Sequence, residues 1–179
     1  MALPLGHALI GASVAALLVP NQPRHELKTV LTSALIAVVP DFDYVFYRVF
    51  DWGEAWHRSF SHSLVFALVL GGLVTLVFGP RRTRYFVIYA AAIFSHAILD
   101  GLVSEQGGVE LFWPFSDRMI HFGLVAYPNI FRGQADFLTI ARRICEYSFV
   151  EAVIFGSILL LVLWARTFSR RRSVLPQEW

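Results

Sequence analysis

Residues 63–80 read SLVFALVLGGLVTLVFGP and contain no charged side chain. The hydrocarbon core of a bilayer is about 30 Å thick, so a spanning helix needs roughly 17 to 25 mostly apolar residues. A helix also satisfies its own backbone N–H and C=O groups, which lipid cannot do. This stretch therefore predicts a membrane-spanning helix, and it decides the class of the protein.

Four further stretches carry the same signal. The second of the resulting five helices is short and is stopped or kinked by Pro40-Asp41. No Lys or Arg precedes the first apolar run, so we expect it to be retained as a helix rather than cleaved as a signal peptide. We expect these four helices at about residues 3–19, 27–39, 85–103 and 149–165.

The stretch between the last two helices, residues 104–148, is rich in aromatics, Gly and Pro. It includes Phe112-Trp113-Pro114-Phe115, and aromatic rings are favoured at headgroup depth. We expect an outer interfacial loop here. The predicted fold class is all-α: a polytopic membrane helix bundle of five hydrophobic helices in a single domain, 1–179.

Composition agrees with a membrane protein. The chain is 56% hydrophobic and only 16% charged, whereas soluble domains are near 25% charged. The net charge of +2 is too small to indicate nucleic-acid binding. One cysteine, Cys145, allows neither an intrachain disulfide nor a cysteine zinc cluster. The expected setting is therefore the inner or plasma membrane, with membrane lipids as partners.

The charged residues predict an orientation, because Lys and Arg near helix ends favour the cytoplasm. With the N-terminus outside, the short cytoplasmic segments are 21–28, 81–84 and the tail from Arg166. They hold 9 of the 15 basic residues, whereas 11 of the 13 acids fall on the outer side or at outer helix ends. We therefore expect an extracytoplasmic N-terminus and a cytoplasmic, Arg-rich C-terminus.

This orientation brings a set of ionisable side chains to one depth. Ionisable groups within a membrane are costly, so each is a candidate for function. Scattered polar residues would fall at both ends of the bundle, whereas these gather at the outer end. The candidate metal ligands are His7, Asp41, Asp43, His57, His62, His96, Asp100 and Glu151.

His96 and Asp100 form the sharpest pair. Their i, i+4 spacing puts both on one helix face. An imidazole and a carboxylate on one face can supply two ligands to a divalent metal such as zinc. The alternative is a hydrogen-bonded His–Asp pair that only ties helices together.

Asp41 and Asp43 follow Pro40 at the break after the second helix. Two carboxylates one residue apart can bind or bridge metals, and one left unligated can act as a general base. The alternative is a pair of solvated acids, or an N-cap for a short helix over residues 44–50.

The segment 57–63, HRSFSHS, holds His57, Arg58 and His62 just before the third helix. The guanidinium fork of Arg58 suits a phosphate, so Arg58 joins the two aspartates as a candidate catalytic residue. Ser61 or Ser63 can N-cap the helix that follows. The alternative is an interfacial loop with ordinary polar anchors.

His7 and Glu151 are weaker candidates. A lone His near a helix start is more often an interface residue than a metal ligand. Glu151 stands near the start of the fifth helix and can reach water from there.

These motifs, in this order, resemble the YdjM-like family. Its members are described as inner-membrane, metal-dependent hydrolases and are sometimes labelled LexA-binding, a label that no motif here supports. The resemblance covers residues 6 to about 118 and, more loosely, the last helix. The matching elements are Gly6-His7, Pro40-Asp41-Phe42-Asp43, residues 57–63, Ser95-His96-Ala97-Ile98-Leu99-Asp100, Gly107-Gly108 and Phe112-Trp113-Pro114-Phe115.

A looser similarity is to zinc-dependent phospholipase C, whose helices carry His-x-x-x-Asp ligands like His96 and Asp100. A second His-x-x-x-Glu helix is missing from this sequence, which argues against a full three-metal cluster. The resemblances imply a hydrolase with one or two divalent metals, zinc first, with manganese or magnesium as alternatives. At headgroup depth the implied substrate is a lipid phosphoester or another membrane-proximal phosphoester.

Two other classes of function stay open. A transporter would line an ion path along the whole bundle, but residues 64–78 are apolar. A non-catalytic membrane protein would use the same site to staple its helices or recruit a partner. The sequence does not indicate the oligomeric state.

Overall fold

A computed structural model describes residues 2–20, 23–50, 56, 58–78, 83–102, 108–124 and 136–174. The chain forms a helical bundle, which confirms the predicted fold class. Its elements are α1 (Pro4–Leu18), α2 (Pro23–Ile36), the 3₁₀ turn η1 (Val39–Phe42), α3 (Asp43–Phe50), the 3₁₀ turn η3 (Phe60–His62), α4 (Leu64–Phe78), α5 (Thr83–Leu102) and α6 (Phe137–Val174).

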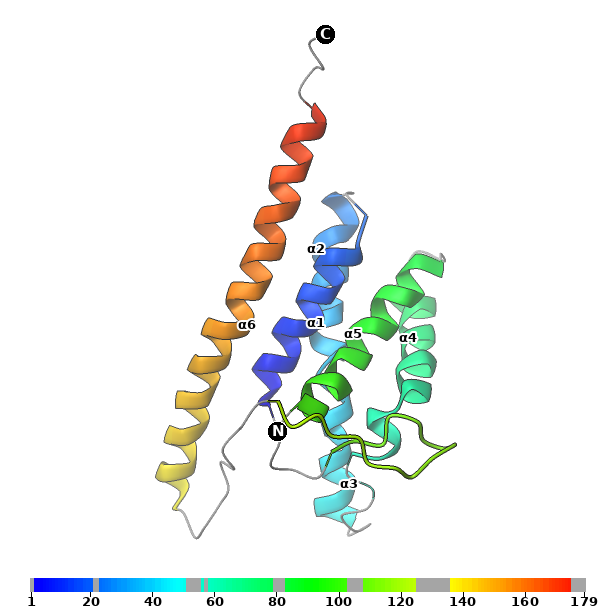
Figure 1. Ribbon diagram of the computed structural model, residues 1–179, viewed down its shortest axis with the longest axis vertical. Coiled ribbons are helices and arrows are strands. Elements are labelled where there is room, and N and C mark those ends of the chain that lie inside the picture. Colours follow the sequence, from blue (N-terminus) through cyan, green and yellow to red (C-terminus); the bar gives the residue numbers. More distant parts are fainter. Residues whose placement is uncertain are drawn as a thin grey trace.

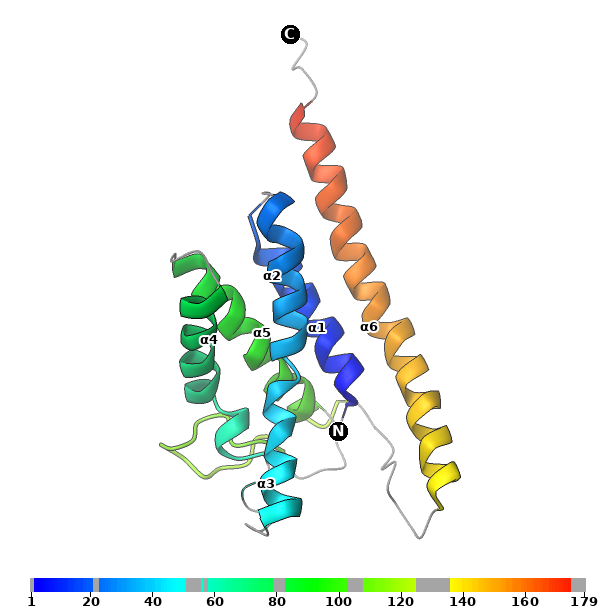
Figure 2. The same ribbon diagram turned by 180° about the vertical axis from the view of Figure 1, so that it is seen from behind.

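Helix α1 is the centre of the bundle. It packs against α2, α5 and α6, while α4 packs against α5 (Figure 1). The view from behind shows α6 and α4 on opposite flanks (Figure 2). The first residues of α1 and α4 and the last residues of α5 lie at one end of the bundle, and the C-terminal end of α6 lies at the other.

Small residues let the helices approach closely, as membrane helices require. A Cβ atom built on Gly71 of α4 would lie 2.8 Å from both the Cα and the backbone N of Ala90 on α5. On α1, a Cβ at Gly11 would collide with Ala37. The glycines at these two crossings therefore set the distances between neighbouring helices.

Within the described part of the chain, three segments are long and apolar enough to cross a membrane: Glu26–Phe46, Thr83–Leu102 and Phe137–Arg170. The first joins α2, η1 and α3, so the second helix predicted at 27–39 is the main part of a longer, kinked segment. Pro40 occupies the 3₁₀ turn at the kink. The first and third predicted helices appear as α1 and α4, which are shorter apolar helices.

Helix α6 begins at Phe137, so the prediction of a loop over 104–148 is wrong for its last part. The first turns of α6 expose Arg142 and Glu146, which form an i, i+4 ion pair at 3.4 Å. A hydropathy criterion misses such turns because they extend the helix beyond the apolar core. Further along, bulky side chains such as Leu160 and Trp164 are exposed, as expected of a surface that faces lipid.

Both ends of α1 are held by charged side chains of α6. The buried carboxylate of Glu151 accepts hydrogen bonds from Leu3 N–H at 2.6 Å and Gly6 N–H at 2.9 Å. At the other end, Arg166 donates to the carbonyls of Ala16 and Val19. The two α6 residues are about 22 Å apart along the helix, about the length of α1. The negative Glu151 lies at the positive, N-terminal end of the α1 dipole, and the positive Arg166 lies at its negative, C-terminal end. Both charges therefore interact favourably with the dipole.

The described part of the predicted interfacial loop, residues 108–124, closes the bundle beside α5 and η3 (Figure 1). Val109 and Ile120 form an antiparallel bridge, and Val109 and Leu111 pack on Ala97 of α5. The aromatic ring of Phe115 is 86% exposed, as expected of a side chain that lies in the headgroup region.

Candidate metal centre

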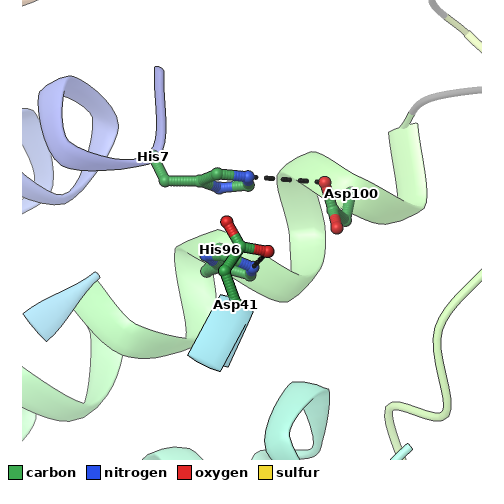
Figure 3. A group of neighbouring side chains, drawn as sticks. All are labelled: His7, Asp41, His96 and Asp100. Atoms are coloured by element: carbon green, nitrogen blue, oxygen red, sulfur yellow. Dashed lines mark ion pairs between the residues drawn. The ribbon is translucent and has the colours of Figure 1, made fainter. Parts of the chain in front are cut away.

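Four side chains from three elements converge at the end of the bundle where α1 begins and α5 ends: His7 of α1, Asp41 of η1, and His96 and Asp100 of α5 (Figure 3). One potential ligand atom from each lies within 4.8 Å of the other three. His7, His96 and Asp100 are fully buried, and Asp41 retains 13% exposure. The sequence predicts all four, and the fold brings them together.

Local structure explains the convergence. His96 and Asp100 share one face of α5, as their spacing predicts. His7 lies in the first turn of α1, which packs against α5, and its ring stacks on His96 with centroids 3.6 Å apart. The turn at Pro40 carries Asp41 to His96, where Oδ1 lies 3.4 Å from Nε2.

The orientation of His96 is set by a backbone carbonyl. Its Nδ1 lies 2.7 Å from the carbonyl oxygen of Ala37, an oxygen that can only accept a hydrogen bond. Nδ1 therefore carries the proton, and in the neutral ring Nε2 presents a lone pair to the cluster. Metal-ligating histidines are held in this way by an outer partner.

His62 of η3 is a fifth member of the cluster. Its Nε2 lies 3.1 Å from His96 Nε2 and 3.5 Å from Asp100 Oδ2. Its Nδ1 lies 3.4 Å from Asp43 Oδ2, the arrangement in which a carboxylate orients a histidine ligand. Burial lowers the pKa of His62, but hydrogen bonds and charges from Asp100 and Asp43 outweigh burial and raise it to about 9.

Two of these separations match the edges of a metal coordination shell better than they match hydrogen bonds. Zinc–ligand bonds of about 2.0–2.1 Å place the corners of a tetrahedron about 3.3–3.4 Å apart. The pairs His7 Nε2–Asp100 Oδ1 and His96 Nε2–Asp41 Oδ1 are both 3.4 Å apart. Charge-assisted hydrogen bonds are shorter, about 2.7–2.9 Å.

Unsatisfied atoms gather at the same place. Among the described residues, buried atoms with no hydrogen-bond partner include both ring nitrogens of His7, Oδ1 of Asp41 and both carboxylate oxygens of Asp100. A buried carboxylate that lacks hydrogen bonds is costly, and coordination to a cation would offset that cost. The donor set of imidazoles and carboxylates suits zinc, and also manganese.

The net charge of the cluster also favours a bound cation. Three aspartates, Asp41, Asp43 and Asp100, lie within this region, and the described cation nearest to them is Arg58. Arg58 Nη2 is 3.9 Å from Asp100 Oδ2. One arginine beside three carboxylates leaves a negative remainder, which a divalent cation would offset.

Asp43 lies behind the cluster rather than in it. Its Oδ2 accepts hydrogen bonds from the backbone N–H of Arg58 at 3.0 Å and from Ser61 Oγ at 2.6 Å. Arg58 has a φ of 67°, in the left-handed region that non-glycine residues rarely adopt. Glu110 N–H donates to the Arg58 carbonyl on the other side. Asp43 therefore positions Arg58 and His62.

Two other predicted ligands have different outcomes. Glu151 is buried, but its carboxylate binds the N-terminus of α1 and is not one of the four clustered residues. His57 lies outside the described residues. Of the two predicted capping serines, Ser63 accepts a hydrogen bond from Phe66 N–H at the start of α4, and Ser61 binds Asp43.

Sequence reasoning missed Ala37 and Glu110. Ala37 acts through its backbone carbonyl, which every residue has, so no side-chain pattern could have indicated it. Glu110 accepts a hydrogen bond from Ser59 Oγ at 2.6 Å and thereby ties the interfacial loop to the segment that carries Arg58. The sequence signal that could have indicated Glu110 is an acidic residue that follows Gly107-Gly108 by two positions.

Comparison with known proteins identifies the family. The family model described as YdjM inner membrane protein matches residues 1–173. The chain belongs to the YdjM family of inner membrane proteins. A curated relative, inner membrane protein YbcI of Escherichia coli (strain K12), is 32% identical over 93 residues, covering 47% of this chain and 52% of YbcI. The chain thus spans about half the length of this relative. No solved structure matches.

Proposed function

We propose that this YdjM-family protein is a membrane-embedded, metal-dependent hydrolase of phosphoesters at the membrane surface. The observation that carries the proposal is the convergence of imidazole and carboxylate atoms at spacings close to tetrahedral edges, together with buried oxygens and nitrogens that lack hydrogen-bond partners. His7, His62, His96 and Asp100 are the proposed ligands, and Asp41, the partly exposed carboxylate beside His96, is left unligated as the proposed general base.

A divalent cation held there, zinc first, would supply a Lewis acid that activates water at neutral pH. Hydrolysis joins the water oxygen to phosphorus and breaks the P–O bond to the alcohol. Asp41 is the clustered carboxylate with solvent exposure, so it takes the water proton and returns it to the departing alkoxide. Arg58 neutralises the charge that develops on the phosphoryl oxygens.

The proposed orientation places this centre on the extracytoplasmic side. The start of α1 and the end of α5, which carry the centre, lie at the opposite end of the bundle from the C-terminal end of α6 (Figure 1). At that end Arg84 of α5 donates to the Leu18 carbonyl, and Arg166 and Arg170 of α6 pair with Glu26 of α2, so described basic residues of three segments gather there. This supports a cytoplasmic C-terminus under the positive-inside rule. Membrane lipids are therefore the proposed neighbours and phosphoester source.

The test is turnover of phosphatidic acid and of soluble p-nitrophenyl phosphate by purified, metal-loaded protein. Removal of a catalytic proton acceptor lowers kcat about 10²- to 10⁴-fold, which is the effect expected for Asp41→Asn. The matched control is Asp117→Asn, an exposed aspartate on the interfacial loop, which should keep full activity. Absence of turnover with every phosphoester would favour a metal site that only joins α1, η1 and α5.

A further inference from the structure

An apolar groove of about 470 Å³ lies between α1, α5 and α6. Its volume is in the range of ligand sites, about 300–1,000 Å³. Ile10 and Val14 come from α1, and Phe155 and Ile158 from α6. The α5 wall repeats at helical spacing along one face: Ala91, Phe94, Ser95, Ile98, Leu99 and Leu102.

The groove can hold only an apolar occupant. Its one polar side chain is Ser95, whose hydroxyl donates to the carbonyl of Ala92 at 2.7 Å on the same helix. A polar ligand would lose its hydrogen bonds to water and find no replacement in the groove. A hydrocarbon chain loses nothing by entering.

The groove starts at the depth of the metal centre. On α1, His7, Ile10 and Val14 follow i, i+3, i+7 spacing, so one stripe leads from the cluster into the groove. Phe155 also reaches this end, because its Cε2 lies 3.0 Å from the Cβ position of Gly6, the neighbour of His7.

From that end the groove runs towards the middle of the membrane. Its α5 wall extends from Leu102, two residues beyond Asp100, back to Ala91. The eleven steps from Ala91 to Leu102 rise about 16 Å, and half of a ~30 Å hydrocarbon core is about 15 Å. The groove therefore has the length of an acyl chain in one leaflet.

The groove is also continuous with the lipid-facing surface. Ile158 lines it and is 40% exposed, and its neighbours on α6, Ile154 and Leu161, are exposed as well. A chain from the adjacent leaflet can thus enter sideways between α5 and α6. Arg58, beside Asp100, supplies the positive charge that complements a phosphate at the outer end.

We propose that this groove binds one acyl chain of a lipid phosphoester whose phosphate lies at the metal centre. This inference rests on the proposed function and names its substrate class as a membrane lipid rather than a soluble phosphoester. The chain anchors the substrate from inside the leaflet while the cluster and Arg58 hold the headgroup.

The test is photocrosslinking in nanodiscs with phosphatidic acid that carries a diazirine at the tip of one acyl chain. We expect the crosslinked residues to lie at the inner end of the groove, at Val14, Ala91 and Ile158. Ile98→Trp fills the groove and should lower this crosslinking about tenfold, since displacing even two methylenes costs about that factor. Val77→Trp, at an exposed position on α4, is the matched control and should change nothing.

Ile158→Trp is a second groove variant, in case Ile98→Trp does not fold. Crosslinks spread evenly over α4 and α6, or an unchanged groove signal in both folded variants, would overturn the inference. The turnover assay separates the two proposals. Groove crosslinking without turnover would support lipid binding in the groove and contradict the hydrolase proposal. Equal turnover of lipid and soluble phosphoesters, with evenly spread crosslinks, would support the hydrolase and contradict lipid binding in the groove.

Discussion

Removing the carboxylate of Glu151 should destabilise the packing of α6 on α1 and leave the metal centre intact. Glu151 is 1% exposed and accepts from Gly6 N–H, which is buried, and from Leu3 N–H, which is partly buried. A buried donor left without its acceptor costs about 1–3 kcal/mol. Leu3 N–H loses its acceptor, whereas Gly6 N–H keeps a second acceptor, the Leu3 carbonyl oxygen at 3.0 Å, so Glu151→Ala should lower the free energy of unfolding by about 1–3 kcal/mol.

The assay is reversible unfolding in mixed micelles of mild detergent and dodecyl sulfate, followed by far-UV circular dichroism. The matched control is Glu146→Ala on the same helix. Glu146 forms only an exposed i, i+4 pair with Arg142, so a change of at most about 0.5 kcal/mol is expected. Metal content is measured on the folded fraction of each variant, where the account predicts no loss. Unchanged stability together with lost metal would refute this reasoning and make Glu151 a ligand.

Two further variants test packing and positioning. Gly71→Ala should cost about 1–3 kcal/mol in the same assay, because the new Cβ meets the Ala90 backbone on α5, whereas Gly156→Ala has nothing within 4 Å and should be neutral or slightly stabilising. Stability losses of equal size in the two would contradict the close approach of α4 and α5. Asp43→Ala removes the acceptor of Arg58 N–H and should destabilise the protein by about 2–4 kcal/mol; a variant that is fully stable but loses its metal would instead make Asp43 a direct ligand.

The sequence could predict much of the bundle because lipid imposes a simple rule. Helices must be apolar over a fixed length, so α4 is visible as an uninterrupted run and α5 as an apolar run that His96 and Asp100 interrupt. The start of α6 is not visible in this way. Its first turns carry Arg142 and Glu146, and their helical state follows from local pairing and from continuity with the apolar part.

In the candidate site, too, some features can be predicted from the sequence and others cannot. His96 and Asp100 are predictable because their spacing fixes a shared face within one helix. The roles of Asp43 and Glu151 are not, because each depends on which backbone N–H groups another segment brings to it. Their charge and their expected depth in the membrane made both candidate ligands. Only the tertiary structure distinguishes a carboxylate that accepts hydrogen bonds from the backbone from one that lies in the cluster.

The central claim is that the clustered histidines and aspartates form a metal site. Its most direct test is the metal content of detergent-purified protein by mass spectrometry, after incubation with a divalent panel, alongside His96→Ala/Asp100→Ala. The account predicts one or two equivalents of zinc or manganese in the parent protein, lost in the double variant and retained in Asp117→Asn. Equal metal content in a folded double variant, or no metal in any of the three proteins, would contradict it.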